Sequence, residues 1–325
     1  MKILVTGGTG FIGSHLVEGL EGDIVCLVRS TSNTDHLRNL GVELVYGDLK
    51  DPYSLEKAIK DVDVVYHLGA YYTFHGKWDS YHSVNVMGTQ YLLQACEQVD
   101  HFIYCSTGEV TGPVSHPPAD ETHPCHPTYE YGKSKLMAEE IVRRKITEEH
   151  FPATIIRPVG VYGPRCVDDV AYYFMVNLAR GSLFTRFIAG SGENLIHFIY
   201  VKDVVQGFLK ARTKKALGET YFISSDRALT YNEVYRTLCT LLGKSPPRLH
   251  IPPALAKAAI APLEAFNKAI GKDDFMAHVS TVEVTQTDRA YSWKKAHADL
   301  GYTPEYSFEE GAQITLDWYR EHGYI

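Results

Sequence analysis

Tyr131 and Lys135 are the residues of this 325-residue chain whose types and spacing most directly suggest chemistry. They stand four residues apart, so a helix would place both side chains on one face, one turn apart. Residues 135–145 are strong helix formers and include neither Gly nor Pro. A neighbouring ammonium group favours the phenolate, which makes the phenol a usable acid or base near neutral pH. Such a pair is also common on solvated helix faces, so it needs support from elsewhere in the chain.

A glycine-rich turn at the start of the chain gives that support. Residues 2–5 predict a short buried strand, residues 6–13 read TGGTGFIG, and a helical pattern then runs from Ser14 to about Leu20. In such a turn one Gly makes the tight bend, one lets the backbone approach a pyrophosphate, and one lets the helix pack close to the strand. The free N–H groups of the helix N-terminus favour phosphates. This placement favours a dinucleotide site over a plain turn.

These two motifs together resemble the extended short-chain dehydrogenase/reductase family. Further matches follow in the family's order over nearly the whole chain: Gly47-Asp48-Leu49, His67-Leu68-Gly69-Ala70, Asn85-Val86-Met87-Gly88-Thr89, Thr107, Ile155-Ile156-Arg157-Pro158, Val161-Tyr162-Gly163-Pro164 and residues 198–205. The resemblance implies an NAD(P)-dependent enzyme whose catalytic residues are Thr107, Tyr131 and Lys135. Tyr131 would exchange a proton with the substrate oxygen, Thr107 would orient that oxygen, and Lys135 would lower the pKa of the phenol and hold the nicotinamide ribose.

The resemblance also implies which residues contact the dinucleotide. Asp48 would contact the adenine amino group, whereas Asn85 is expected to be structural or to hold a water molecule. The full set of expected contacts is Gly7, Gly10, Phe11, Ile12, Gly13, Arg29, Ser30, Asp48, Leu49, Leu68, Gly69, Ala70, Asn85, Ser106, Tyr131, Lys135 and Pro158.

The end of the second predicted strand bears on the choice of cofactor. Residues 23–28 predict this strand, and a carboxylate usually follows it where the adenine ribose 2′-hydroxyl is recognised. Here Arg29 and Ser30 follow. An Arg can pair with a 2′-phosphate, which a carboxylate would repel. NADP(H) is therefore favoured over NAD(H), although Arg29 could instead stack on adenine or face water.

The rhythm of strands and helices predicts an α/β fold, a Rossmann-type doubly wound parallel sheet with a smaller C-terminal α+β lobe for the substrate. Residues 1–164 would form the dinucleotide-binding domain and residues 165–325 the substrate-binding lobe, with the chain returning to the first domain near residues 197–225. An apolar helical stretch spans about residues 254–270, and Pro262 should kink or split it because proline removes a helix hydrogen bond.

Composition limits the partners. The net charge of −7 argues against nucleic acid and anionic membranes, which attract clustered Lys and Arg. The apolar run within the 254–270 stretch is too short to span a bilayer. The chain begins directly with a predicted strand, and six scattered cysteines without a CxxC pair fit a reducing compartment, so we expect a cytoplasmic protein. The resemblance suggests a homodimer formed through the helix that carries Tyr131.

A metal site is not expected. His116, His123, Cys125 and His126 cluster in a Pro-rich stretch, but their spacing is not that of a rigid ligand set. In the family this stretch is a loop before the catalytic Tyr. We interpret it as a solvated loop.

The substrate is less clear. The family's nucleotide-sugar epimerases carry an Arg two residues before the Phe of the 198–201 strand, where this chain has Ile196. Its dehydratases follow the catalytic Thr with an Asp-Glu pair, where this chain has Gly108-Glu109. Aromatic residues after the fourth strand could contact the substrate or pack between the lobes. The expected substrate contacts are Tyr71, Tyr72, Thr107, Glu109 and Arg186.

Three functions therefore stay open. The first is an oxidoreductase that interconverts a secondary alcohol and a ketone on a fairly apolar small molecule. The C-terminal run from Lys295 to Trp318 favours it, because this run resembles the hydroxysteroid dehydrogenase and dihydroflavonol reductase branch. The second is a nucleotide-sugar epimerase or dehydratase with a tightly held cofactor. The third is a dinucleotide sensor without catalysis, which the intact Thr107, Tyr131 and Lys135 set argues against.

Overall fold

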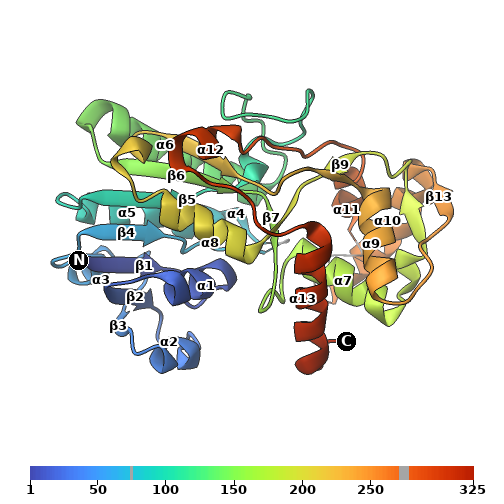
Figure 1. Ribbon diagram of the computed structural model, residues 1–325, viewed down its shortest axis with the longest axis horizontal. Helices are drawn as coiled ribbons and strands as arrows, with labels where there is room; N and C mark the ends of the chain where they lie inside the picture. Colours follow the sequence, from blue (N-terminus) through green and yellow to red (C-terminus); the bar gives the residue numbers. More distant parts are fainter. Residues whose placement is uncertain (74–75, 271–277) are drawn as a thin grey trace.

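Apolar and β-branched runs form a central parallel sheet. The computed structural model describes residues 1–73, 76–270 and 278–325, and within them seven strands pair in the order β11-β6-β5-β4-β1-β2-β3, all parallel (Figure 1). The strands are β1 (Lys2–Thr6), β2 (Asp23–Val28), β3 (Glu43–Tyr46), β4 (Val64–His67), β5 (His101–Cys105), β6 (Ala153–Pro158) and β11 (Thr220–Ile223). From β1 the chain adds β2 and β3 toward one edge of the sheet. It then crosses to β4 on the other side of β1 and continues toward the opposite edge. A ligand site is expected outside the carboxyl ends of the strands at such a switch point.

Helices cover both faces of this sheet. Alternate side chains of β1 point to opposite faces, so Ile3 and Val5 join one core cluster and Leu4 joins the other. Helices α1 (Phe11–Gly19) and α8 (Val201–Lys210) pack together on the first face. Helices α3 (Pro52–Ala58), α5 (Gly88–Ala95) and α6 (Glu130–Glu149) cover the second. The predicted doubly wound α/β fold is confirmed.

Shorter elements gather at one end of the sheet, on the right of Figure 1, and we call them the distal group. The distal group comprises α7 (Val170–Arg180), β8 (Phe187–Ala189), β9 (Leu195–Ile196), β12 (Leu229–Thr230), α9 (Tyr231–Leu241), β13 (Leu249–Ile251), α10 (Pro253–Ala269) and α11 (Val279–Val284). Its strands form the pairs β12-β9 and β13-β8, and the pair β10 (Phe198–Tyr200) with β7 (Gly160–Tyr162) lies nearer the sheet. After the distal segment around β8 and β9, the chain runs through α8 and β11 at the main sheet before it enters α9.

The remaining helices are short connectors or lie near the C-terminus. They are α2 (Asp35–Asn39), α4 (Trp78–Tyr81), a π-helical stretch (His82–Met87), 3₁₀ turns at Gly108–Val110, Leu183–Thr185 and Lys214–Ala216, α12 (Lys294–Leu300) and α13 (Phe308–Glu321). Ser307 and Glu310 form a capping box that starts α13.

Pro262, which is expected to kink or split the stretch of residues 254–270, lies inside α10 and does not split it. Proline leaves the carbonyl four residues earlier, that of Ala258, without its helical partner. Both Pro262 and Ala258 are exposed, so water can serve that carbonyl and the helix continues. Neither α10 nor any other helix of the described residues combines the length and apolar content needed to cross a membrane.

Candidate active site

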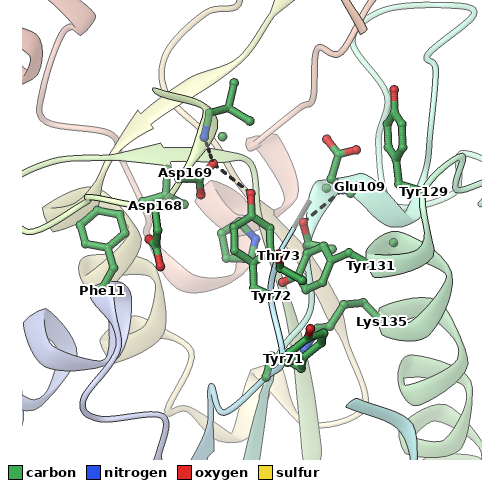
Figure 2. Close-up of a pocket in the computed structure, with 18 of the residues that line it drawn as sticks. Phe11, Tyr71, Tyr72, Thr73, Glu109, Tyr129, Tyr131, Lys135, Asp168 and Asp169 are labelled. Atoms are coloured by element: carbon green, nitrogen blue, oxygen red, sulfur yellow. Dashed lines mark hydrogen bonds between the residues drawn. The ribbon is translucent and has the colours of Figure 1, made fainter. Parts of the chain in front are cut away.

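A cavity of about 1170 Å³ extends from the glycine turn at the end of β1 into the distal group. Its walls include Gly7 at one end, Tyr131 in the middle and Ile260 at the other end. Figure 2 shows Tyr131 and Lys135 projecting from α6 into this space toward Tyr72. The cavity therefore joins the two regions that the sequence motifs single out.

The glycine turn has the shape needed to hold a dinucleotide. Gly7 has a φ of +75°, and a Cβ there would lie 2.7 Å from the backbone N of Gly69. A Cβ on Gly13 would lie 2.1 Å from the carbonyl oxygen of Gly7. Helix α1 starts after Gly10 without a side-chain cap, so its first N–H groups can serve a phosphate. The turn thus fits the pyrophosphate role predicted for it.

Most of the expected dinucleotide contacts line this cavity, but Ser30 and Asn85 do not. Those on its wall are Gly7, Gly10, Phe11, Ile12, Gly13, Arg29, Asp48, Leu49, Leu68, Gly69, Ala70, Ser106, Tyr131, Lys135 and Pro158. Ser30 is exposed and does not border the cavity, whereas Ser32 does. The contact of Ser30 with the dinucleotide therefore stays a prediction.

Asn85 is buried and holds the backbone at Tyr71. Its side chain accepts a hydrogen bond from the N–H of Tyr71 at 2.7 Å and donates to the carbonyl of the same residue at 3.1 Å. It also donates to the hydroxyl of Ser134 on α6 at 2.9 Å. With its amide occupied in this way, Asn85 positions the wall rather than contacting a ligand. These hydrogen bonds suit the structural role expected of Asn85, and its contact with the dinucleotide stays a prediction.

Tyr131 and Lys135 occupy neighbouring turns at the start of α6, as their spacing predicts. Lys135 is buried, with its ammonium 4.3 Å from the ring centroid of Tyr104, and burial lowers its pKa to about 8. Burial also raises the pKa of Tyr131, with further upward contributions from nearby acidic groups including Glu109. The pKa of Tyr131 therefore shifts upward rather than downward as expected, and burial is the largest cause. A phenol in this state keeps its proton at neutral pH and can donate it.

Thr107 lies beside Tyr131 on the cavity wall, at the end of β5. Its hydroxyl accepts a hydrogen bond from the N–H of Glu109 at 3.2 Å and caps the short 3₁₀ turn that follows. The hydroxyl proton stays available for a substrate oxygen. The arrangement can therefore offer two O–H donors, from Thr107 and Tyr131, to one oxygen.

Tyr72 connects the loop after β4 with the opposite wall. Its ring meets that of Tyr131 edge-on at a centroid distance of 4.9 Å, and its hydroxyl donates to Asp169 at 3.2 Å. Asp169 also caps the first turn of α7, and burial raises its pKa to about 6. Asp168 and Asp169 both line the cavity. The sequence analysis names Tyr72 but neither carboxylate. Asp168 and Asp169 come after the family motif of residues 161–164, which ends at Pro164.

Glu109 and Arg289 form an ion pair on the cavity wall that sequence reasoning also missed. An Nη1 of Arg289 donates to Oε2 of Glu109 at 2.6 Å. The Arg289 backbone N–H donates to the carbonyl of Leu195 at 2.8 Å, and residue 289 bridges in parallel to Ile196. Burial opposes the charge on Arg289, but Glu109 more than compensates and raises the pKa of the guanidinium. A cation absent from position 196 is thus present at residue 289, which bridges to Ile196.

The other arginines considered for the substrate side are engaged elsewhere. Arg165 makes a two-pronged ion pair with Glu18 at 2.7 and 2.9 Å. Arg180 donates to the carbonyl of Tyr324. Arg186 is exposed and does not border the cavity, and its substrate contact stays a prediction. It follows the 3₁₀ turn before β8, and only the next residues reach the wall.

The His and Cys residues of the Pro-rich stretch make ordinary contacts. Cys125 accepts a hydrogen bond from Arg157 at 3.2 Å, and the ring of His123 contacts the carbonyl of Pro124. Within the part of the chain that the structure describes, no three His, Cys, Asp or Glu side chains gather as metal ligands would.

Comparisons with known proteins agree with this geometry. Residues 3–224 match the model of the NAD dependent epimerase/dehydratase family. A 2-alkyl-3-oxoalkanoate reductase of Stenotrophomonas maltophilia (strain K279a) is 31% identical, covering 96% of this chain and 97% of that protein. A dTDP-D-glucose 4,6-dehydratase of Mus musculus is 30% identical, covering 99% and 89%. The crystal structure of a Bacillus cereus UDP-glucuronic acid 4-epimerase in complex with NAD has a TM-score of 0.77 at 26% identity, with 99% of each chain covered. The resemblance and the prediction of an enzyme are confirmed.

Proposed function

Because the chain belongs to the NAD dependent epimerase/dehydratase family, we propose that it is an NADP(H)-dependent oxidoreductase that interconverts a secondary alcohol and a ketone on a small organic substrate. The observation that carries the proposal is the apolar character of the cavity wall in the distal group. Its apolar side chains are Phe174, Phe187, Ile188, Ile196, Ile260 and Val282, and they stand beside polar ones such as Tyr231, Glu264, His278 and Thr281. The apolar part of this wall can bind the hydrocarbon of a substrate.

Three residues would perform the proton transfer and the positioning. In the reducing direction Tyr131 donates its proton to the carbonyl oxygen, and Thr107 hydrogen-bonds the same oxygen and fixes its direction. Lys135 stabilises the negative charge left on Tyr131 and holds the ribose beside it. A bound nicotinamide dinucleotide supplies the hydride to the carbonyl carbon, so that ketone, hydride and proton give the alcohol.

The charges of the cavity support a substrate without a diphosphate. Glu109, Asp168 and Asp169 place carboxylates around the same space, whereas Lys135 and Arg289 are the cations on its described walls outside the adenine end. Of these two, Arg289 already gives its Nη1 to Glu109, which leaves one edge of a single guanidinium for a substrate anion. A diphosphate brought into this space needs cations to offset its lost hydration.

A nucleotide-sugar epimerase or dehydratase is the second candidate. It is favoured by the similarity to the dehydratase and the epimerase named above, over nearly the whole chain. Glu109 also stands where the family's dehydratases carry the Glu of their Asp-Glu pair. The residue before it is Gly108, however, and the Glu109 carboxylate contacts Arg289.

Binding of UDP, UDP-glucose and dTDP-glucose separates the two candidates. We expect these ligands to bind dinucleotide-loaded protein with dissociation constants of roughly a millimolar or weaker, about −4 kcal/mol, because the described substrate end offers no unpaired cation cluster. Calorimetric titration and thermal shift measure this. The same protein should exchange its dinucleotide freely and reduce ketones with net NADPH consumption.

Micromolar binding of any of the three ligands, together with a dinucleotide that does not exchange, would favour the epimerase. An Arg289→Gln variant would then show whether Arg289 holds the diphosphate, because binding through that residue should be lost with it.

The preference for NADP(H) rests on Arg29. This residue lines the adenine end of the cavity and is exposed, and its side chain makes no hydrogen bond or ion pair with the described residues. A guanidinium free in this position can form charge-assisted hydrogen bonds to a 2′-phosphate. The position after β2 carries no carboxylate that would select the 2′-hydroxyl instead.

Replacing Arg29 by Asp should weaken NADPH binding by about ten-fold or more relative to NADH binding, because a contact worth roughly 1.5–3 kcal/mol becomes a repulsion. Isothermal titration with both cofactors measures the change. Arg38→Asp is the matched control, because Arg38 is exposed nearby on α2 but bonds Thr34 and Tyr46 outside the cavity. Equal losses for the two cofactors in the Arg29 variant would mean that Arg29 does not contact the 2′ position.

A cytoplasmic location and a homodimer stay predictions of this proposal. Size-exclusion chromatography with light scattering tests the second of them.

A further inference from the structure

Arg289 has features of a ligand-binding residue that its ion pair does not explain. Its side chain is 5% exposed and lines the cavity, and its Nε is buried without a hydrogen-bond partner among the described residues. Buried polar groups are nearly always satisfied, so an unpartnered N–H on the wall of a cavity indicates a place for an acceptor.

The guanidinium is held in a fixed orientation. One Nη donates to Glu109, the backbone at residue 289 is tied to Leu195, and the guanidinium carbon lies 5.9 Å from the ring centroid of Tyr129. A guanidinium has more than one edge that can donate two parallel hydrogen bonds. The ion pair uses Nη1, which leaves the edge containing Nε for a second planar anion.

This site lies close to the reacting atoms. Glu109 contacts Arg289 through its side chain and Thr107 through its backbone N–H. Glu109 also contributes to the raised pKa of Tyr131, which places its carboxylate near the phenol. Arg289 therefore lines the same cavity as Thr107 and Tyr131 and is linked to Thr107 through Glu109.

We propose that Arg289 binds a carboxylate of the substrate, and that the enzyme acts on 3-hydroxy or 3-oxo acids whose hydrocarbon chain lies along the apolar distal wall. The inference rests on the oxidoreductase function proposed above and narrows its substrate class. The one free edge of the Arg289 guanidinium suits one carboxylate. A diphosphate would bring two negative charges to this single cation. Glu109 is 38% exposed at its side chain, so it has room to turn as the carboxylate arrives.

The test compares three alcohols that differ only near the reacting carbon: 3-hydroxyoctanoate, its methyl ester and 2-heptanol, each oxidised with NADP⁺. Oxidation transfers a hydride from C3 (C2 of the heptanol) to NADP⁺ and releases the hydroxyl proton, which leaves the ketone. We expect wild-type kcat/KM for the acid to exceed that for the ester by about 10- to 100-fold, as for a charge-assisted contact.

Arg289→Gln should remove this preference. Its kcat/KM for the acid should fall by roughly 10- to 100-fold, mainly through KM, while the values for the ester and 2-heptanol stay within about three-fold. Arg289→Lys keeps the charge without the planar fork and should retain part of the preference. Arg227→Gln is the matched control, because Arg227 is exposed and pairs with Glu233 away from the cavity. Melting temperatures of all variants identify any loss of folded protein.

Two results would overturn the inference while leaving the oxidoreductase proposal intact. One is a wild-type enzyme that oxidises the acid and the ester equally well. The other is an equal loss for all three alcohols in folded Arg289→Gln, which would make the ion pair with Glu109 purely structural. If the wild type oxidises none of the alcohols and reduces none of the matching ketones, the oxidoreductase proposal itself fails and the inference fails with it.

Discussion

Tyr131→Phe should lower kcat by roughly 10²–10⁴-fold, the usual contribution of general acid–base transfer, while dinucleotide affinity stays nearly unchanged. The change removes one hydroxyl and leaves the ring, so the edge-on contact with Tyr72 remains. Because burial raises the pKa of Tyr131, the wild-type residue enters the reducing reaction with its proton in place. Steady-state kinetics with a ketone and NADPH, together with calorimetric binding of NADPH, measure the two effects separately.

Tyr129→Phe is the matched control. Tyr129 precedes α6 by one residue and lines the same cavity, but its hydroxyl donates to the carbonyl of Ser280 at 3.4 Å. We expect this variant to lose less than about ten-fold in kcat, because no proton transfer is assigned to it. If Tyr131→Phe keeps more than about a tenth of wild-type activity, another group donates the proton.

The features that the sequence predicts well are local ones. The four-residue spacing of Tyr131 and Lys135 fixes their relation once a helix forms, whatever the rest of the chain does. The approach of Gly13 to the carbonyl of Gly7 is equally local, because it lies within a single strand–turn–helix unit, whereas the close approach of Gly7 is to Gly69 after β4. Pro262 shows the limit of local rules, since its effect on α10 depends on whether water reaches the carbonyl of Ala258.

The features that sequence reasoning missed join residues far apart in the chain. Glu109 and Arg289 are 180 residues apart, and Tyr72 and Asp169 are 97 apart. No spacing rule links such positions, because the distal group brings them together only when it closes over the carboxyl ends of the sheet. The same holds for Arg186, which the sequence places in the right segment but which does not border the cavity.

A buried network of charged side chains joins α6 to β6 and to the end of β5, which precedes Thr107. Glu139 on α6 is fully buried, accepts hydrogen bonds from Nη2 and Nε of Arg157 at 2.6 and 3.2 Å, and accepts one from the hydroxyl of Ser106 at 2.7 Å. Arg143 adds a second cation at 2.7 Å. Ser106 immediately precedes Thr107, so this carboxylate ties α6, β6 and the end of β5 into one unit.

Glu139→Gln should lower the free energy of unfolding by about 3–5 kcal/mol, because it leaves the buried charge of Arg157 without its counter-ion. Urea unfolding at pH 7 measures this. Glu149→Gln on the same helix is the control. Glu149 pairs with Lys145 at 2.6 Å but is 60% exposed, so we expect a loss of only about 0–1 kcal/mol.

The pH dependence of stability gives the same network a second, independent test. Burial alone would raise the pKa of Glu139, but Arg157, followed by Arg143 and Ser106, outweighs it and holds the folded-state pKa below the ordinary value of 4.5. A depressed folded pKa contributes stability that is fully present above the unfolded pKa and is lost as pH falls through the folded one. The difference in unfolding free energy between wild type and Glu139→Gln should therefore be largest near neutral pH and shrink in acid. A difference that stays constant down to the folded pKa would mean that packing around residue 139, rather than its charge, sets the stability of this unit.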